Sequence, residues 1–400
     1  MNPTPTARLH ALDNLRAVMM WLGIVIHVIA MFTVGRSPLP WHDSASTRFA
    51  DLGMAFIHAF RMPVFFIVAG FFVAMLVQQR GIGGMVRHRF RRIALPFLVF
   101  WVPVVVATIL AVLLYVFNAR HGRFGIDATL FTPPPGRPVV NTMHLWFLYL
   151  LWWLALLAAG AFALGRRLPA AWARVLPQGL RLLISRWWGP LVLTVPLVLA
   201  GLGHPHGIVA PHGSLLPHWS EWLHNGLFFA AGLALYGARD TLLPLYARHA
   251  WPLALAGVPF FLAAGGLVEA VQQGRAPANA TAWTAAAYNL ATWCWSGAAI
   301  GLFLRYLPRR RPLLAYLADS AYWVYLVHFP LTVAFGALLW HAPLPALAKI
   351  GLNIALTTTT CLLAYQALVR GRWIGRLLNG APRPVAAAAA GAHPALTQRA

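Results

Sequence analysis

Residues 16–34 read RAVMMWLGIVIHVIAMFTV, an apolar segment that is long enough to cross a membrane and carries two basic side chains, Arg16 and His27. Their positions are eleven residues apart, which is close to three helical turns, so both lie on the same side of a helix, about 16 Å apart along its axis. Ionisable side chains are costly inside a membrane helix, and those found there usually belong to a functional site. The segment therefore predicts a membrane helix that carries part of a site.

The whole chain has the composition of a membrane protein. Of its 400 residues, 60% are hydrophobic and only 10% are charged, whereas soluble domains carry about 25% charged residues. The formal net charge of +23 comes almost entirely from arginines between apolar segments, which is the pattern of cytoplasmic loops rather than of a nucleic-acid-binding surface. These numbers predict an all-α, polytopic membrane protein, with the lipid bilayer as a partner and no nucleic acid.

Ten apolar segments are expected to span the bilayer. The fifth is short and contains Pro190 and Pro196, which makes it the weakest of the set. The expected spans are 16–34, 54–78, 93–117, 143–165, 187–203, 221–238, 250–270, 283–305, 321–340 and 346–369.

Arginines gather in every second loop, which predicts the topology. Loops 79–92, 166–186, 239–249 and 306–320 are rich in arginine, as is the chain after residue 370, and the alternate loops are poor in basic residues. Because positive charge marks cytoplasmic loops, both termini are expected on the cytoplasmic side of the membrane. That arrangement requires an even number of spans.

The ends and one loop have distinct expected roles. No A-x-A-like cleavage site follows the first apolar segment, so we expect a retained helix rather than a signal peptide. Residues 1–379 are expected to form one transmembrane domain, and the Ala/Pro-rich residues 380–400 a disordered cytoplasmic tail. Loop 166–186 mixes basic and apolar residues and could lie along the inner leaflet.

Asp13, Arg16 and His27 are the first candidate site residues. Asp13 and Arg16 are three residues apart at a helix start, so they can form an ion pair. His27 lies past the middle of the span, where only a partner or a water-filled cavity makes it tolerable. The alternative interpretation is a structural ion pair, together with a histidine that bonds a neighbouring helix.

Further candidates lie at the outer ends of other segments. His58 and Arg61 are spaced i, i+3, which predicts one shared face on the second segment, although Arg61 could instead extend to the lipid headgroups. His144 opens the fourth segment beside Trp146 and Tyr149, which an interfacial aromatic belt would also explain.

Two more candidates open or occupy later segments. Glu221 stands near the start of the sixth and is expected to line an outer vestibule. His328 lies two turns into the ninth, and Pro330 is expected to kink that helix and free a backbone carbonyl. His27 and His328 could therefore reach similar depths in one cavity.

The sequence gives little support to metal or hydrolytic chemistry. His204, His206, His212 and His218 match no standard metal-binding pattern, so a solvated loop is favoured over a metal site and no metal is expected. Cys294 and Cys361 lie in apolar segments and suggest no disulfide framework. There is no Gly-rich phosphate loop, G-x-S-x-G or H-E-x-x-H motif.

Four stretches carry a family resemblance. They are, in chain order, LDNLRAVMMWLGIVIHV (12–28), FIHAFRMPVFFIVAGFF (56–72), HLWFLYLL (144–151) and YWVYLVHFPLT (322–332). Together they resemble the integral-membrane acyltransferase family 3, whose hallmark is an Arg and a His separated by ten residues in the first helix. Within the family, the stretches are most similar to the glucan biosynthesis protein C subfamily, which decorates osmoregulated periplasmic glucans. The resemblance runs from Leu12 to about Arg370.

The resemblance implies an enzyme that transfers an acyl group, succinyl in that subfamily, from cytoplasmic acyl-CoA to a hydroxyl of a periplasmic glucan. By position, His27 would be the general base and Arg16, with Asp13 beside it, would contact the donor. His58, Arg61 and Glu221 would contact substrate, and His144 and His328 would complete the cavity. Acyl-CoA would be a co-substrate, with no tightly bound cofactor.

Two alternatives stay open at this stage. One is an acetyltransferase of the same family that acts on another envelope glycan or a small-molecule hydroxyl. The other is a glycan transporter or flippase, which the lack of an internal repeat and of acidic residues deep in the spans disfavours. The donor, the acceptor and the oligomeric state are not determined by the sequence.

Overall fold

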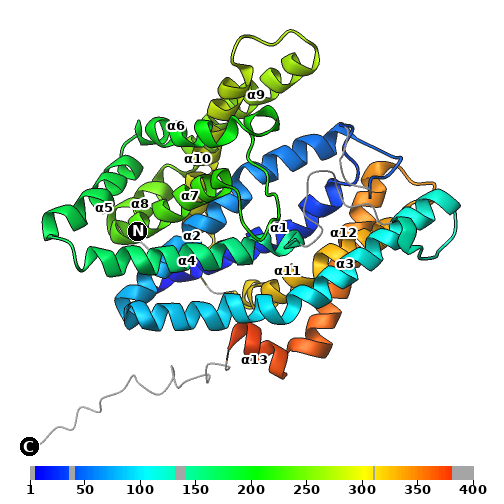
Figure 1. Cartoon of the computed structure of the whole chain (residues 1–400), viewed down its shortest axis with the longest axis horizontal. Helices are drawn as coiled ribbons and strands as arrows, with labels where there is room; N and C mark the ends of the chain where they lie inside the picture. Colours follow the sequence, from blue (N-terminus) through cyan, green and yellow to red (C-terminus); the bar gives the residue numbers. More distant parts are fainter. Residues whose placement is uncertain (1–4, 36–40, 131–140, 310, 381–400) are drawn as a thin grey trace, which may run out of the picture.

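The computed structural model describes residues 5–35, 41–130, 141–309 and 311–380, and in these ranges the chain forms helices and no strand (Figure 1). The α-helices are α1 (Pro5–Ile29), α2 (Arg48–Arg89), α3 (Leu95–His121), α4 (Trp146–Gly165), α5 (Ala170–Ser185), α6 (Gly189–Gly201), α7 (Trp219–Gly237), α8 (Arg239–Arg248), α9 (Ala250–Gln272), α10 (Ala280–Tyr306), α11 (Pro312–Leu339), α12 (Ala346–Ala364) and α13 (Trp373–Asn379). Short 3₁₀ or π segments are η1 (Phe90–Ala94), η2 (Ala128–Leu130), η3 (Met143–Leu145), η4 (Pro205–Gly207) and η5 (Tyr365–Val369). The all-α prediction is confirmed for these ranges, and the expected tail lies, apart from Gly380, outside them.

Each of the ten apolar segments coincides with a helix, but not all of these helices qualify as spans by themselves. Six helical runs in the described part of the chain are long and apolar enough to cross a membrane, or seven if the bent pair α5–α6 counts as one. One of the six is the run Arg48–His121, which contains two expected segments. Helix α6 has only 13 residues and needs α5 to reach sufficient length. The chain is thus a multi-pass membrane protein. Helices α7 and α10 are not apolar enough to be counted among these spans.

Helices α7 and α10 are less apolar than the other long helices because they carry polar side chains that point into the protein. On α10, residues Thr284, Asn289, Thr292 and Ser296 are all buried, as are Glu221 and Asn225 on α7. A helix that is enclosed by other helices needs no continuous apolar surface, since its polar groups find partners within the bundle.

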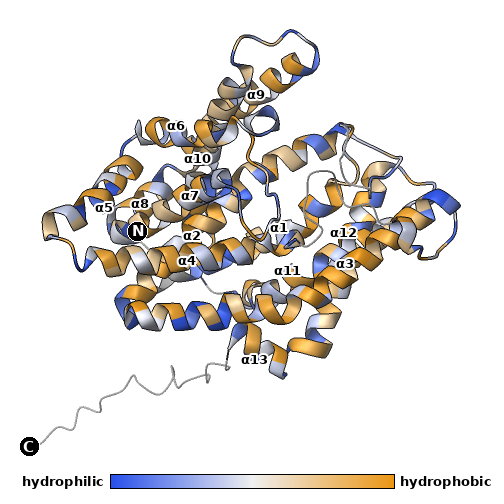
Figure 2. Ribbon diagram, viewed as in Figure 1, coloured by the Kyte–Doolittle hydropathy of each residue, from blue (hydrophilic) through white to orange (hydrophobic). Residues whose placement is uncertain are grey.

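The outer helices carry the opposite pattern (Figure 2). On α3 the exposed residues Leu98, Val102, Val106 and Leu110 recur every fourth position and form an apolar stripe. An uninterrupted stripe of this kind is unfavourable in water and is expected where a helix faces lipid.

One connection differs from the prediction. Residues 79–92 were expected to form a basic loop, yet α2 continues through them and joins α3 by the π-helical turn η1. Only Gly81 breaks the helix, with a φ of 69° that favours glycine. The chain contains no proline between Pro63 and Pro96, so no missing N–H group interrupts the helix there.

Helix α1 lies at the centre of the bundle and packs against α2, α10, α11 and α12. In Figure 1 it runs between α2 and α11, with α4 crossing in front. Its residues Leu12, Leu15, Ile24 and Val28 are almost completely buried. The apolar side of α1 therefore faces other helices and not lipid.

Helices α2 and α7 touch through their backbones. A methyl group added at Gly70 would lie 2.0 Å from the carbonyl oxygen of Phe229, and one added at Gly232 would lie 1.9 Å from that of Ile67. Glycines at both contact points are what allows two membrane helices to approach this closely. The crossing fixes the side chains of α2 relative to those of α7.

The connection between α1 and α2 is tied to α12 by a buried ion pair. Lys349 Nζ lies 3.1 Å from both carboxylate oxygens of Asp43 and donates a hydrogen bond to the carbonyl of Trp340. Both side chains are at most 3% exposed. Trp41, two residues earlier, packs edge-on against Phe329 of α11.

We expect Gly70→Ala to lower the free energy of unfolding by about 1–3 kcal/mol, because the new methyl overlaps the α7 backbone. Thermal unfolding of the purified protein in detergent measures this. Gly160→Ala on α4 is the control, since its methyl meets no atom within 4 Å. Equal melting temperatures for the two variants would contradict the close crossing.

Candidate active site

Three histidine rings meet at the centre of the bundle. They belong to His27 of α1, His144 of η3 and His328 of α11. The ring centroid of His328 lies 5.3 Å from that of His27 and 5.4 Å from that of His144. Phe329 packs against both other rings, at 4.8 Å from His27 and 5.0 Å from His144. His27 and His328 therefore share one site, as their expected depths suggested.

Carbonyl groups of α11 fix His144. Its Nε2 lies 3.2 Å from the carbonyl oxygens of both Tyr325 and Leu326. The Leu326 oxygen is available because Pro330, four residues later, has no backbone N–H to donate to it. The freed carbonyl that the sequence predicted is thus used by a site histidine. Tyr325 returns a hydrogen bond from its hydroxyl to the carbonyl of His144, at 2.7 Å.

Arg61 is buried beside the histidine cluster. Its side chain is 7% exposed, and its Nε donates a 3.0 Å hydrogen bond to the carbonyl of Met19 on α1. The interpretation that Arg61 extends to lipid headgroups is therefore wrong. A buried guanidinium needs a compensating anion or several hydrogen bonds, and none of the ion pairs formed among the described residues includes Arg61.

Gly23 allows Arg61 and His328 to approach α1. A methyl group at this position would lie 2.9 Å from Arg61 Nη2 and 3.1 Å from His328 Nε2. Gly23 is one helical turn before His27, so the bare backbone lies next to the catalytic candidate. This glycine was not singled out from the sequence, where nothing distinguishes it from others in apolar segments.

His58 and Arg61 bond different helices, although their spacing predicts one shared face of α2. His58 Nδ1 lies 3.2 Å from the hydroxyl of Tyr288 on α10, whereas Arg61 bonds α1. Residues three apart differ by about 60° around a helix. Because α2 is wedged between α1 and α10, that difference sends the two side chains to different neighbours.

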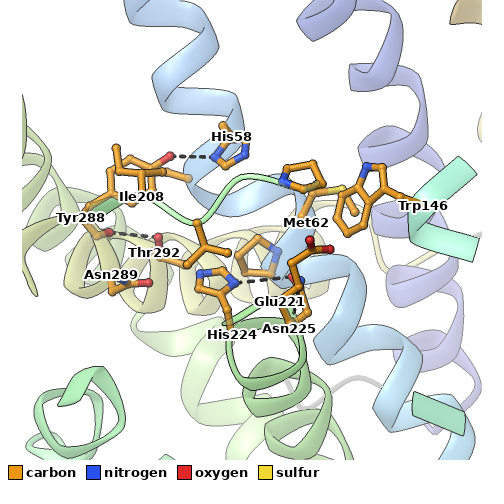
Figure 3. Close-up of a pocket in the computed structure, with 14 residues that line it drawn as sticks. His58, Met62, Trp146, Ile208, Glu221, His224, Asn225, Tyr288, Asn289 and Thr292 are labelled. Atoms are coloured by element: carbon orange, nitrogen blue, oxygen red, sulfur yellow. Dashed lines mark hydrogen bonds between the residues drawn. The ribbon is translucent and has the colours of Figure 1, made fainter. Parts of the chain in front are cut away.

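A second, polar pocket lies between α2, α7 and α10 (Figure 3). His58, Glu221, His224 and Trp146 are among its lining residues. Glu221 is 3% exposed and accepts a 2.9 Å hydrogen bond from the backbone of His212. The pocket holds about 30 Å³, enough for a water molecule or one small polar group. Glu221 and His58 thus lie together, but apart from the three histidines.

The histidine-rich outer loop borders this pocket. His204 Nε2 lies 2.8 Å from Ser220 Oγ, and the rings of His212 and His218 have centroids 5.0 Å apart and planes tilted by 46°. Burial lowers the pKa of His204, and the charges of His218 and His212 lower it further. Among the described residues, no three His, Cys, Asp or Glu side chains are arranged to hold a metal ion.

Arg16 and Asp13 lie at the other end of α1. Their side chains form an ion pair of 3.3 Å and are 47% and 44% exposed. The structure therefore does not bring them to the histidine cluster, since α1 is an uninterrupted helix and separates them from it by about 16 Å.

Near Arg16 lies a basic cavity that sequence analysis treated only as loop charge. Its volume is about 430 Å³, and its lining residues are Arg80, Gly84, Arg87, His88, Arg91 and Arg92. Arg89 is close enough to Arg16 to feel its charge, and its buried Nε and Nη2 have no partner among the described residues. The dense basic run HRFRR (88–92) was the available signal for an anion-binding site. A loop assignment could not predict that these residues are helical and line one cavity.

Comparison with known proteins identifies the family. The sequence profile described as "Acyltransferase domain", that of acyltransferase family 3, matches residues 9–366. The chain belongs to acyltransferase family 3. The chain is 31% identical over 153 residues to the glucans biosynthesis proteins C of Escherichia coli K12, SMS-3-5 and O1:K1. Each alignment covers 38% of either chain, so it spans well under half the length of these relatives. No solved structure matches it.

If the chain transfers acyl groups, as its family membership implies, we expect Gly23→Ala to slow that transfer by roughly 100-fold while the protein still folds, because displacing reacting groups by an ångström can cost that much. The methyl would push Arg61 and His328 away from α1. Initial rates in detergent, with melting temperature as the folding check, measure the effect. Gly226→Ala is the matched control, since its methyl would meet Leu154 Cδ2 at an ordinary 3.6 Å. A wild-type rate for Gly23→Ala would contradict this assignment.

Proposed function

We propose that this membrane acyltransferase transfers a succinyl group from cytoplasmic succinyl-CoA to hydroxyls of a periplasmic glucan in a bacterial inner membrane. The observation that carries the proposal is the buried Arg61 guanidinium next to three clustered histidines. This arrangement places a cation that can bind the donor acyl group next to an imidazole base that can deprotonate the acceptor hydroxyl.

The donor would enter from the end of α1 that carries Arg16. The basic cavity there can bind the phosphates of CoA, because guanidinium groups pair with phosphate oxygens through strong charge-assisted hydrogen bonds. An extended pantetheine arm is long enough to cover the separation of about 16 Å between Arg16 and His27. Asp13 would hold Arg16 through their ion pair.

His27 would act as the general base. It removes the proton of the acceptor hydroxyl as the oxygen attacks the thioester carbon, and the C–S bond then breaks to release CoA. The same proton passes from His27 to the leaving sulfur, so His27 ends the cycle neutral. An imidazole suits this role because its ordinary pKa lies close to physiological pH.

Arg61 would select the acyl group. A succinyl group ends in a free carboxylate, which would give the buried guanidinium the anionic partner that it lacks among the described protein groups. An acetyl group has no such carboxylate. Arg61 therefore favours succinylation over acetylation.

The polar pocket beside the outer loop would contact the acceptor. Glu221, His58 and His224 can each bond a hydroxyl group, and Trp146 provides an aromatic surface. A carboxylate in the lining disfavours anionic groups, which fits a neutral glucan better than a phosphate-bearing one. His144 and His328 would close the cavity between this pocket and α1.

The proposed topology has ten membrane helices with both termini in the cytoplasm. It places the basic cavity on the cytoplasmic side, in keeping with the positive-inside rule. Helices α7 and α10 would then cross the bilayer inside the bundle, where their buried polar residues are shielded from lipid.

The first test uses purified protein in detergent with succinyl-CoA and glucan. We expect release of free CoA thiol and a succinyl mass increment on the glucan from wild type, and loss of both by at least about 100-fold in His27→Ala, since a general base contributes that much. Wild-type turnover without a membrane gradient would exclude transport as the main function. Normal glucan substitution by His27→Ala would overturn the mechanism.

The second test concerns donor choice. We expect Arg61→Met to lower kcat/KM for succinyl-CoA by about 10- to 100-fold, as for a lost charge-assisted contact, and to change that for acetyl-CoA much less. Competition between the two donors, read by mass spectrometry of the product, gives the ratio directly. Equal losses for both donors would mean that Arg61 does not contact the carboxylate.

A further inference from the structure

His328 has a buried lone pair without a partner. Its Nδ1 lies 2.9 Å from the carbonyl oxygens of both Val324 and Tyr325. A carbonyl can only accept, so Nδ1 must carry the ring proton and Nε2 must be an acceptor in the neutral ring. Nε2 is inaccessible to water and has no hydrogen-bond donor among the described residues. An unsatisfied buried acceptor in a native site calls for a partner.

His144 cannot supply that partner. Its Nε2 also faces two carbonyls and must carry the proton, which leaves its Nδ1 as a second buried lone pair without a partner. Tyr325 cannot supply it either, because its hydroxyl donates to the carbonyl of His144. The remaining donors beside His328 are the ring of His27 and the guanidinium of Arg61.

The ring of His27 has the right spacing for this bond. Its ring centroid lies 5.3 Å from that of His328 with the planes tilted by 44°. Two imidazoles joined by one N–H···N bond of ordinary length have centroids roughly 5 Å apart. A small rotation of the His27 ring, which is only partly buried, is therefore enough to form this bond. Arg61 already donates to Met19, and the proposed function assigns its other N–H groups to the acyl carboxylate.

We propose that His328 is the positioning residue for His27 and accepts a hydrogen bond from one ring nitrogen of it, as a carboxylate does in a Ser-His-Asp triad. This inference rests on the proposed function, in which His27 is the base. The bond would fix the tautomer of His27, so that its other nitrogen faces the acceptor hydroxyl with a free lone pair.

The proton balance is simple. During attack the hydroxyl proton moves to the free nitrogen of His27, and the proton shared with His328 stays on His27. His328 keeps its own proton on Nδ1 throughout, and His27 returns the transferred proton to the CoA sulfur as the C–S bond breaks. A neutral imidazole can stabilise the imidazolium of His27 without adding a buried anion that would pair with Arg61 in place of the substrate.

Two substitutions separate positioning from mere packing. The amide nitrogen of Asn overlaps His Nδ1, so His328→Asn keeps the donor to the α11 carbonyls but removes the acceptor. The amide oxygen of Gln overlaps His Nε2, so His328→Gln keeps the acceptor but removes that donor. If His328 positions His27, we expect kcat to fall by about 100-fold in His328→Asn and much less in His328→Gln.

A structural role predicts the reverse order, because only His328→Asn retains the hydrogen bonds to Val324 and Tyr325. That result would overturn the proposal. The groups that act electrostatically on His27 are His328, Arg61 and His144. His328→Asp should therefore move the acidic limb of the pH–rate profile to higher pH, since a carboxylate stabilises protonated His27.

A measurement that does not use activity distinguishes failure of this inference from failure of the proposed function. Ring ¹⁵N NMR of histidine-labelled protein, assigned with His27→Asn and His328→Asn, reports the tautomer of each ring. We expect one tautomer of His27 in wild type and a mixture in His328→Asn. A tautomer mixture of His27 in wild type would refute the hydrogen bond even if acyl transfer occurs. A single tautomer without transfer would refute only the proposed function.

Discussion

One turn of α11 holds the candidate site together through its backbone carbonyls. The oxygens of Val324, Tyr325 and Leu326 accept hydrogen bonds from two imidazoles, those of His328 and His144. Inside a membrane bundle no bulk water can replace such partners, so each bond also decides which ring nitrogen keeps its lone pair. Pro330 makes this possible because it leaves the Leu326 carbonyl unpaired within the helix.

The sequence was sufficient for some of these features. Apolar segments of the sequence located ten of the helices, α1–α4, α6, α7 and α9–α12, because a helix that crosses a bilayer needs a long stretch of mostly apolar residues. The cost of ionisable groups in a membrane helix singled out His27, Arg61 and His328. Their expected depths suggested only that His27 and His328 could reach one cavity, and the structure brings their ring centroids to 5.3 Å from one another.

Other features needed three dimensions. The divergence of His58 and Arg61 depends on which helices flank α2, and no spacing rule contains that information. The basic cavity arises because α2 continues as a helix past Gly81. The clustered arginines alone predict a cytoplasmic loop there. Gly23 is important only because Arg61 and His328 approach it from other helices.

The backbone contact between α2 and α7 has a consequence for how the protein can move. With Gly70 and Gly232 each pressed against a carbonyl of the other helix, the two helices cannot slide or separate without losing that contact along the crossing. They behave as one rigid wall of the polar pocket shown in Figure 3. Any widening of this pocket to admit a larger molecule would therefore have to come from its other walls, which are α10, Trp146 and the stretch from Ile208 to Pro211.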